Sequence, residues 1–425
     1  MAPQQQQSIE LEGPVIKKVD EFIKSVHVEA YMPRHVVIGL MTPKLYRGNI
    51  ENMRRRDEKN RCLDDFLTEC NVEHQDIIVR ELQENSPSLR SFYDLDVVPD
   101  LTDKSILEMV RDGCYILSQC LNMKNIMDHQ VAADDLNRFL CTNSEPDIVR
   151  DVLFLYENQI PFKVLDTLYT RLVQGRTRPQ LKDLMVKWVC EHLQWQKYIR
   201  GEPAKNLDFR HLLELVHMII TTSVPTVLLG SSSPDTIWDR ATNYEEHAAV
   251  TFLYRPLDGA CTRSILDVSL GRCGRLHIPP LIIYTDTLPM LRNLMLLEKY
   301  NICVNKHVTS YCFFLSKLAR CDQDIAFLSK KRIIDNNLQN NNLAATRISE
   351  ITSGFSPNLP IENYLQKIAD ALDSRFHSCT YQNISWLKLQ KMQNMAMLAL
   401  SLGGIIIFVC SIIQAVCSII SCPKK

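Results

Sequence analysis

The chain has 425 residues, of which 46% are hydrophobic and 23% are charged, so it can bury a sizeable core. Its 48 basic residues against 49 acidic residues leave a formal net charge of -1. Because this balance creates no overall attraction to nucleic acid or to an acidic membrane surface, composition predicts no nucleic-acid partner.

Fifteen cysteines are scattered singly along the chain, with no C-x-x-C pair among them. An odd total rules out complete pairing, and a free cysteine packs as a small apolar residue. We therefore predict free thiols, most of them buried, as in a reducing compartment.

The N-terminal region begins with a Gln-rich tail, residues 1–12, which is predicted to be disordered because it has no means of packing. It lacks the apolar run and the early positive charge of a secretory signal peptide. From residue 13 to Val26, apolar residues recur with helical spacing, and this pattern predicts a helix.

A glycine interrupts the apolar face of the helix predicted from SILEMVRDGCYIL, residues 105–117. Gly113 shares its face with Met109 and Val110 and costs about 1 kcal/mol relative to Ala in a helix interior. Close approach of another element would offset that cost, so we predict a packing role. The alternative, an anion-binding loop at RDGC, lacks the glycine-rich spacing of such loops.

The stretch YENQIPF, residues 156–162, contains three polar residues followed by a proline. Pro161 cannot donate to the carbonyl of Glu157, and its ring displaces that carbonyl, so the helix should kink or stop here. An unpaired buried carbonyl costs about 1 to 3 kcal/mol, and the amides of Asn158 and Gln159 are nearby donors. We predict that Glu157, Asn158, Gln159 and Pro161 form a structural polar plug; a binding site is the alternative.

Short β-branched runs bounded by Gly or Pro occupy about 248–284 and predict a small β insertion. Pro279 and Pro280 must lie at a strand start or edge, since neither can donate to a ladder. Helical patterns precede and follow the insertion, whereas the polar stretch 335–342 predicts a loop. The predicted fold class is mainly α with a small antiparallel β insertion (α+β), in one domain of residues 13–390.

The segment from Met395 to Ile420 contains 26 residues without an ionisable group. At about 1.5 Å per residue, a helix of this length exceeds the roughly 30 Å of a bilayer core. We predict one C-terminal transmembrane helix over 395–420, a short tail over 421–425, and a plasma-membrane location.

Orientation in the membrane stays open, because lysines flank both ends of the segment. The short tail favours a tail-anchored protein with its large part in the cytosol. Asn383 begins an N-x-S triplet, so glycosylation on the opposite side of the membrane is the alternative.

Known catalytic signatures do not occur in this sequence: it has no H-E-x-x-H, G-x-S-x-G or Walker loop. Cys303, His307 and Cys312 lie within ten residues but lack the close Cys pairs of structural zinc sites. Glu245 and His247 form an acid-base cluster that an enzyme could use. We predict no catalytic, cofactor-binding or metal residues and no cofactor.

Nine stretches, in order from about residue 14 to 421, resemble the plant DUF247 family, also called UPF0481. They are YMPRHVVIGL with YRGN, EMVRDGCYIL, RDVLFLYENQIPFKVLDTLY, EEHAAVTF, GRLHIPPLIIY, LRNLMLLEKY, VTSYCFFLSKL, DIAFLSKKRII and the C-terminal apolar segment. The resemblance implies a membrane-associated plant protein with no established enzymatic activity. Some grass members of this family are implicated in self-incompatibility, a form of cell-cell recognition.

We therefore expect a membrane-anchored plant protein that acts by binding, in cell-cell recognition or signalling, without catalysis. Its expected partners are an unidentified protein and, through the C-terminal helix, the lipid bilayer; no nucleic acid or metal is expected. The alternatives are a hydrolase-like enzyme using Glu245 and His247, and a tail-anchored cytosolic scaffold.

Overall fold

The structure is a computed structural model that describes most of the chain. The described residues are 15–41, 50–84, 89–127, 146–174, 179–202, 207–224, 238–301, 304–338, 340–356, 364–393 and 395–420. The predicted tails at 1–12 and 421–425 lie outside them. The described chain is mainly helical, with a few short strands.

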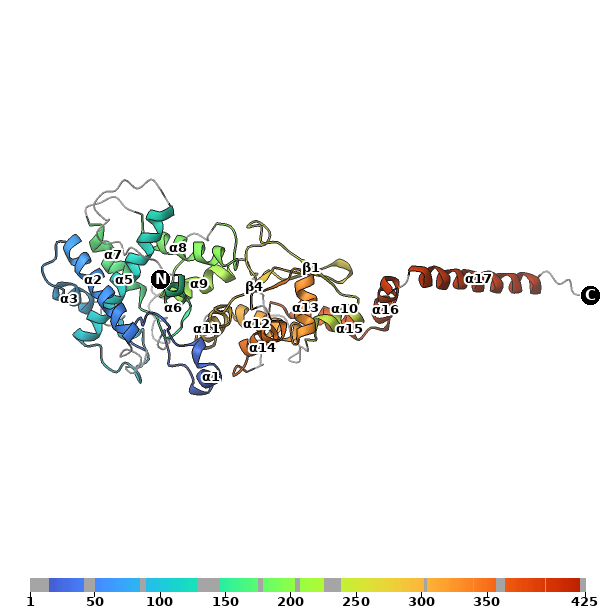
Figure 1. The fold of residues 1–425 in the computed structure, drawn as a ribbon, viewed down its shortest axis with the longest axis horizontal. Helices are drawn as coiled ribbons and strands as arrows, with labels where there is room; N and C mark the ends of the chain where they lie inside the picture. The colour runs from blue at the N-terminus through green and yellow to red at the C-terminus, as the bar shows by residue number, and fades with distance from the viewer. Residues whose placement is uncertain are drawn as a thin grey trace, which may run out of the picture.

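The N-terminal half is built around one long helix, α5 (Asp103–Met127), which packs against α2, α3, α7 and α8 (Figure 1). The other elements of this half are α1 (Glu21–Val26), η1 (Val28–Ala30), α2 (Ile50–Glu69), α3 (Asp76–Glu84), α6 (Pro146–Phe154), α7 (Phe162–Leu172), α8 (Leu181–Trp195) and α9 (Leu212–Thr221).

The helix expected from residue 13 begins later, at Glu21. Ile16 instead forms an isolated parallel bridge with Tyr93, and the Ile16 N–H donates to the carbonyl of Phe92 at 2.8 Å. The carboxylate of Asp20 then accepts from the N–H of Phe22 and caps α1. The prediction was wrong here because the bridge takes the backbone groups that an earlier helix would need.

Gly113 lies where α5 meets α7. A Cβ atom at this position would lie 2.5 Å from Cδ1 of Leu168 and 3.4 Å from Cγ1 of Val164. Both neighbours belong to α7, so the absence of a side chain at Gly113 lets the two helices approach.

We expect Gly113→Ala to lower the free energy of unfolding by about 1 kcal/mol. Overpacking against Leu168 costs about 1 to 3 kcal/mol, and the better helix propensity of Ala returns about 1 kcal/mol. Urea unfolding measures the difference. In a Leu168→Ala background the same substitution should stabilise the protein, and a penalty that persists there would contradict the close-packing role.

Two small sheets form instead of one antiparallel insertion. β1 (Thr251–Tyr254) and β3 (Arg275–Ile278) pair in parallel, and β2 (Ser269–Gly271) pairs antiparallel to β3, in the order β1-β3-β2. A short 3-10 turn, η3 (Arg272–Gly274), joins β2 to β3. The antiparallel prediction is therefore wrong for β1 and β3.

The second sheet pairs β4 (Leu281–Ile283) in parallel with β5 (Ile334–Asn336). All three residues of β4 are buried, as the strands of parallel pairs require. Pro279 and Pro280 lie between β3 and β4, outside both ladders. β5 overlaps the start of the stretch 335–342 expected to be a loop, because a three-residue strand is too short to show an alternating pattern.

The C-terminal half is built around α11 (Thr287–Tyr300), in which every residue from Thr287 to Glu298 is buried. α11 packs against α6, α9, α12, α14 and η1. The remaining helices are α10 (Ala241–His247), α12 (His307–Leu318), α13 (Asp322–Lys330), α14 (Asn341–Ile351), α15 (Gln366–Phe376) and α16 (Cys379–Gln393). The cysteines that the structure describes are present as thiols, and the buried ones among them are Cys62, Cys114, Cys120, Cys190 and Cys312.

Helix α17 (Met395–Ile420) extends away from the rest of the chain (Figure 1). Across the described ranges, α17 included, no helix combines the length and apolar character that a bilayer crossing demands. Such a crossing takes about 20 consecutive apolar residues. The part of α17 whose side chains are described covers only 402–415 and contains Ser411 and Gln414. The predicted transmembrane helix and the membrane location that depended on it are wrong.

Candidate binding pocket

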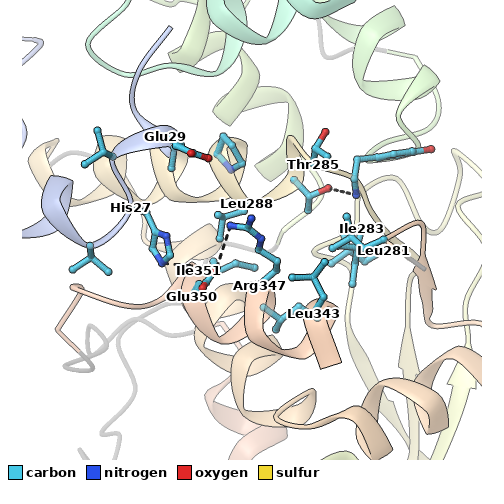
Figure 2. A pocket seen from close by; sticks show the side chains of 18 of the residues that line it. His27, Glu29, Leu281, Ile283, Thr285, Leu288, Leu343, Arg347, Glu350 and Ile351 are labelled. Carbon is cyan, nitrogen blue, oxygen red and sulfur yellow. Dashed lines mark hydrogen bonds and ion pairs between the residues drawn. The ribbon is translucent and has the colours of Figure 1, made fainter. Parts of the chain in front are cut away.

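A cavity of about 600 Å³ opens between the N-terminal segment, β4, α11 and α14 (Figure 2). Its apolar walls include Leu281, Ile283, Leu288, Leu343, Ile348 and Ile351. Its polar and charged lining includes His27, Glu29, Arg34, Arg347 and Glu350. A volume of this size is typical of sites that hold a small ligand or an inserted side chain.

Helix α14 supplies one wall of this pocket. The side chain of Asn340 accepts hydrogen bonds from the N–H groups of Asn342 and Leu343, and this cap starts the helix. Leu343, Arg347 and Glu350 follow at spacings of four and three, so they share one face of α14. Leu343 is 42% exposed and stands at the pocket, whereas Ile348 and Ile351 are buried in its wall.

The turn between β4 and α11 is held by Thr287. Its hydroxyl accepts from the N–H of Tyr284 at 3.0 Å and donates to the carbonyl of Ile282 at 3.2 Å. Because these bonds close the turn, Ile283 and Leu288 are both directed at the cavity from its β4 and α11 side (Figure 2).

Opposite charges and a histidine meet beside α14. Nη1 of Arg347 lies 3.3 Å from Oε2 of Glu350, and Nε2 of His27 lies 3.9 Å from the same oxygen (Figure 2). Burial lowers the pKa of His27, and the guanidiniums of Arg292 and Arg347 lower it further, against the opposing effect of Glu350. His27 is therefore neutral near pH 7 and can donate or accept a hydrogen bond.

A buried arginine fixes the base of this region. Nε of Arg292 donates to the hydroxyl of Tyr31 at 2.8 Å, and Nη1 donates to the carbonyls of Glu350 and Ile351 at the C-terminus of α14. The negative end of the helix dipole favours a cation there. Burial raises the pKa of Tyr31 to about 12, so its hydroxyl stays protonated. Arg292 thus ties the N-terminal segment and α14 to α11.

The polar plug lies between the end of α6 at Phe154 and the start of α7 at Phe162, and its four residues are buried. Oδ1 of Asn158 accepts from the N–H of Ile38 at 2.6 Å. Nδ2 of Asn158 donates to the carbonyls of Val36 and Asp151 at 3.1 and 2.9 Å. This side chain therefore joins the N-terminal segment to the last turn of α6.

Gln159 closes the same helix end. Its Nε2 donates to the carbonyls of Val152 and Leu155 at 3.0 and 2.9 Å, and its Oε1 accepts from the N–H of Leu213 at 3.1 Å. Three of the four carbonyls that the two amides reach lie at or just after the end of α6, the fourth is that of Val36, and none is that of Glu157 as expected. The reason is that α6 ends at Phe154, before the residue whose carbonyl Pro161 would displace. Its last carbonyls are therefore left without helical donors.

Glu157 and Pro161 complete the plug. Oε1 of Glu157 accepts from the N–H of Val19 at 2.8 Å, and Oε2 lies 2.6 Å from Nζ of Lys24. Pro161 occupies the N-cap position of α7 without a side-chain hydrogen bond. The polar side chains of the plug thus bond to other groups of the protein, and none of its four residues lines the pocket.

The acid-base residues Glu245 and His247 lie on α10, two positions apart, and such a spacing does not place them on one helix face. Oε1 of Glu245 lies 2.9 Å from Nζ of Lys331. The side chain of His247 is 57% exposed, and its Nε2 lies 4.0 Å from the carboxylate of Glu246. The structure does not bring the two together.

The possible metal residues are not assembled in the part of the chain that is described. Cys303 lies outside it, and His307 and Cys312 are buried in α12. Within the described ranges, no group of three or more His, Cys, Asp and Glu side chains is arranged to hold a metal ion.

The possible glycosylation residue, Asn383, is exposed in the middle of α16. Two positions later, the hydroxyl of Ser385 is buried and donates to the carbonyl of Glu245 at 2.7 Å. The triplet is therefore part of a helix whose serine packs onto α10.

Sequence reasoning missed every residue of the pocket. His27, Ile283 and Arg347 lie far apart in the chain, and nothing local marks them as neighbours. The one available signal was the spacing of Leu343, Arg347 and Glu350 on one helix face, which is also typical of an ordinary amphipathic helix.

Comparisons with known proteins agree on one family. The model of the DUF247 family, described as a plant protein of unknown function, matches residues 16–410. The UPF0481 protein At3g47200 of Arabidopsis thaliana is 25% identical over 393 residues, covering 84% of this chain and 76% of the relative. No solved structure matches the chain. With the family model covering nearly its whole length, this chain belongs to the DUF247 family of plant proteins.

Proposed function

We propose that this protein acts by binding a protein partner, in recognition or signalling, and that its pocket receives an apolar side chain of that partner. The observation that carries the proposal is Leu343, an exposed apolar side chain at an apolar cavity lined by charges of both signs. A partner side chain inserted in the pocket would pack against Leu343, so that both side chains would be removed from water.

The energetics of the pocket suit this kind of partner. Burying one side chain of Leu or Phe size stabilises a complex by about 1.5 to 3 kcal/mol. The carboxylates of Glu29 and Glu350 and the guanidiniums of Arg34 and Arg347 provide acceptors and donors beside the apolar walls. A peptide has both kinds of group in its backbone, so it can pair with both.

The positions of the candidate catalytic residues also support binding over the hydrolase alternative. Lys331 engages the carboxylate of Glu245, and His247 faces solvent. A general base needs a free acceptor within hydrogen-bond reach of a reacting group. The pocket, by contrast, offers apolar walls with charged groups of both signs beside them, which supports binding.

A peptide selection tests the proposal. Random peptides displayed on phage are selected against the full chain, and the enriched peptides are labelled and titrated by fluorescence anisotropy. We expect Leu343→Glu to weaken their binding by at least about tenfold, because it places a carboxylate that must be desolvated at the apolar contact.

The matched control is Ile77→Glu on α3, since Ile77 is 44% exposed, close to the 42% of Leu343. Both variants should keep the wild-type urea midpoint, and the control should keep wild-type affinity. Peptides that bind Leu343→Glu as tightly as the wild type, or a selection that yields no saturable binder, would contradict the proposed function.

A further inference from the structure

A second cavity, of about 530 Å³, lies between α2, α5 and the segment 37–40. Figure 1 shows the ribbons of α2 and α5 in blue and cyan. This cavity belongs to the N-terminal half, whereas the pocket described above is formed largely by α11, α14 and β4. Its lining contains five basic and two acidic side chains: Arg55, Arg56, Lys59, Lys104 and Arg111, with Glu108 and Asp112. The cavity is therefore strongly basic, although the whole chain is nearly neutral.

Two of the five cations are neutralised within the fold. Nζ of Lys59 lies 2.5 Å from Oδ1 of Asp112, which also accepts from the N–H of Gly39 through Oδ2. Nη1 of Arg55 lies 2.8 Å from Oε2 of Glu58. Both pairs are mostly buried; the first holds α2 against α5 and the segment before it, whereas the second lies within α2.

Two of the other three cations share one carboxylate. Oε1 of Glu108 lies 3.0 Å from Nη1 of Arg111 and 3.7 Å from Nη2 of Arg56. Among the described residues, no carboxylate forms an ion pair with Lys104, which is exposed. An excess of positive charge therefore stands in the cavity, where a concave wall concentrates the field.

Hydrogen-bond donors of a second kind border the same cavity. The hydroxyls of Thr102 and Ser105 lie 3.0 Å apart at the N-terminus of α5, and Thr102 accepts from the N–H of Ser105. The positive end of the 25-residue helix adds to the charge of the basic side chains. The nearby carboxylate of Asp103 does not line the cavity and is engaged by Nε2 of Gln83.

We propose that this basic cavity binds a small soluble anion with two or more phosphate groups. Guanidinium forks match phosphate oxygens in geometry, and Arg56 and Arg111 provide two of them. Lys104 adds a mobile point charge, and the two hydroxyls add neutral donors. One phosphate would satisfy only part of this set, so a ligand with several phosphates is favoured.

Calorimetric titration of the full chain with inorganic phosphate, pyrophosphate and inositol hexakisphosphate tests the inference. We expect affinity to increase in that order and to fall as salt rises from about 50 mM to about 300 mM, since the interaction is between charges. The Arg56→Gln/Lys104→Gln double variant should weaken binding of inositol hexakisphosphate by at least about tenfold. Both side chains are exposed, so the fold should tolerate the change.

The matched control is Arg320→Gln/Lys367→Gln, which removes the same two residue types from exposed positions elsewhere. It should bind all three anions as the wild type does. The inference would be overturned by an equal loss of affinity in both double variants, by the absence of saturable binding, or by undiminished binding to the Arg56→Gln/Lys104→Gln variant. Equal affinity for heparin of matched charge would also overturn it, because that result would indicate a non-specific basic surface.

Discussion

Asn158→Leu is expected to lower the free energy of unfolding by about 3 kcal/mol or more. Leu has the branched shape of Asn with methyl groups in place of the amide oxygen and nitrogen, so the change removes hydrogen bonds without opening a cavity. The buried groups left unpaired are the N–H of Ile38 and the carbonyls of Val36 and Asp151. Each unpaired buried group costs about 1 to 3 kcal/mol.

Gln159→Leu should be destabilising by a similar amount, since it strands the carbonyls of Val152 and Leu155 and the N–H of Leu213. Urea unfolding followed by circular dichroism measures both variants. The control is Asn383→Leu on the exposed face of α16, which should change stability by less than about 0.5 kcal/mol. Stabilities of the two plug variants within that range of the wild type would refute the structural role of the plug.

The sequence predicts a break between α6 and α7 because two amide side chains and Pro161 stand close together there, although α6 ends before the residue that Pro161 affects. For the same reason it predicts the packing role of Gly113, where a gap in an apolar face is visible from spacing alone. The sequence does not predict which distant residues complete these contacts. Ile38 and Leu213, which bond the plug, lie more than fifty positions away from it.

Contacts between distant segments account for the features that the sequence did not predict. The bridge of Ile16 to Tyr93 replaces the first part of a predicted helix, and the pairing of β4 with β5 joins segments separated by fifty residues. The local sequence shows Arg292 only as a charged residue within an apolar helix. Its role depends on a helix terminus more than fifty residues later, so only the folded chain reveals it.

Moderate acid is expected to destabilise the protein through a buried histidine. His211 has no exposed surface, and its Nδ1 accepts from the N–H of Glu214. Burial lowers the pKa of His211 to about 4. His192, whose Nε2 is buried, has its pKa lowered in the same direction and by the same cause.

Both imidazoles stay neutral in the folded protein down to about pH 4, whereas in the unfolded chain they bind protons below about pH 6.5. The unfolded state therefore gains protons first, and stability falls as the pH decreases through this window. For His211, lowering the pH from about 7.5 to about 5 should remove about 2 kcal/mol from the free energy of unfolding.

Urea unfolding at the two pH values measures this loss, and His211→Asn tests its source. Asn retains a side-chain acceptor for the N–H of Glu214 at the start of α9, so the variant keeps the cap while removing the imidazole. Its loss of stability between the two pH values should be smaller than that of the wild type by about 2 kcal/mol. The exposed His247→Asn variant controls for removal of an imidazole and should keep the wild-type loss. If His211→Asn also keeps the wild-type loss, the acid sensitivity does not come from His211.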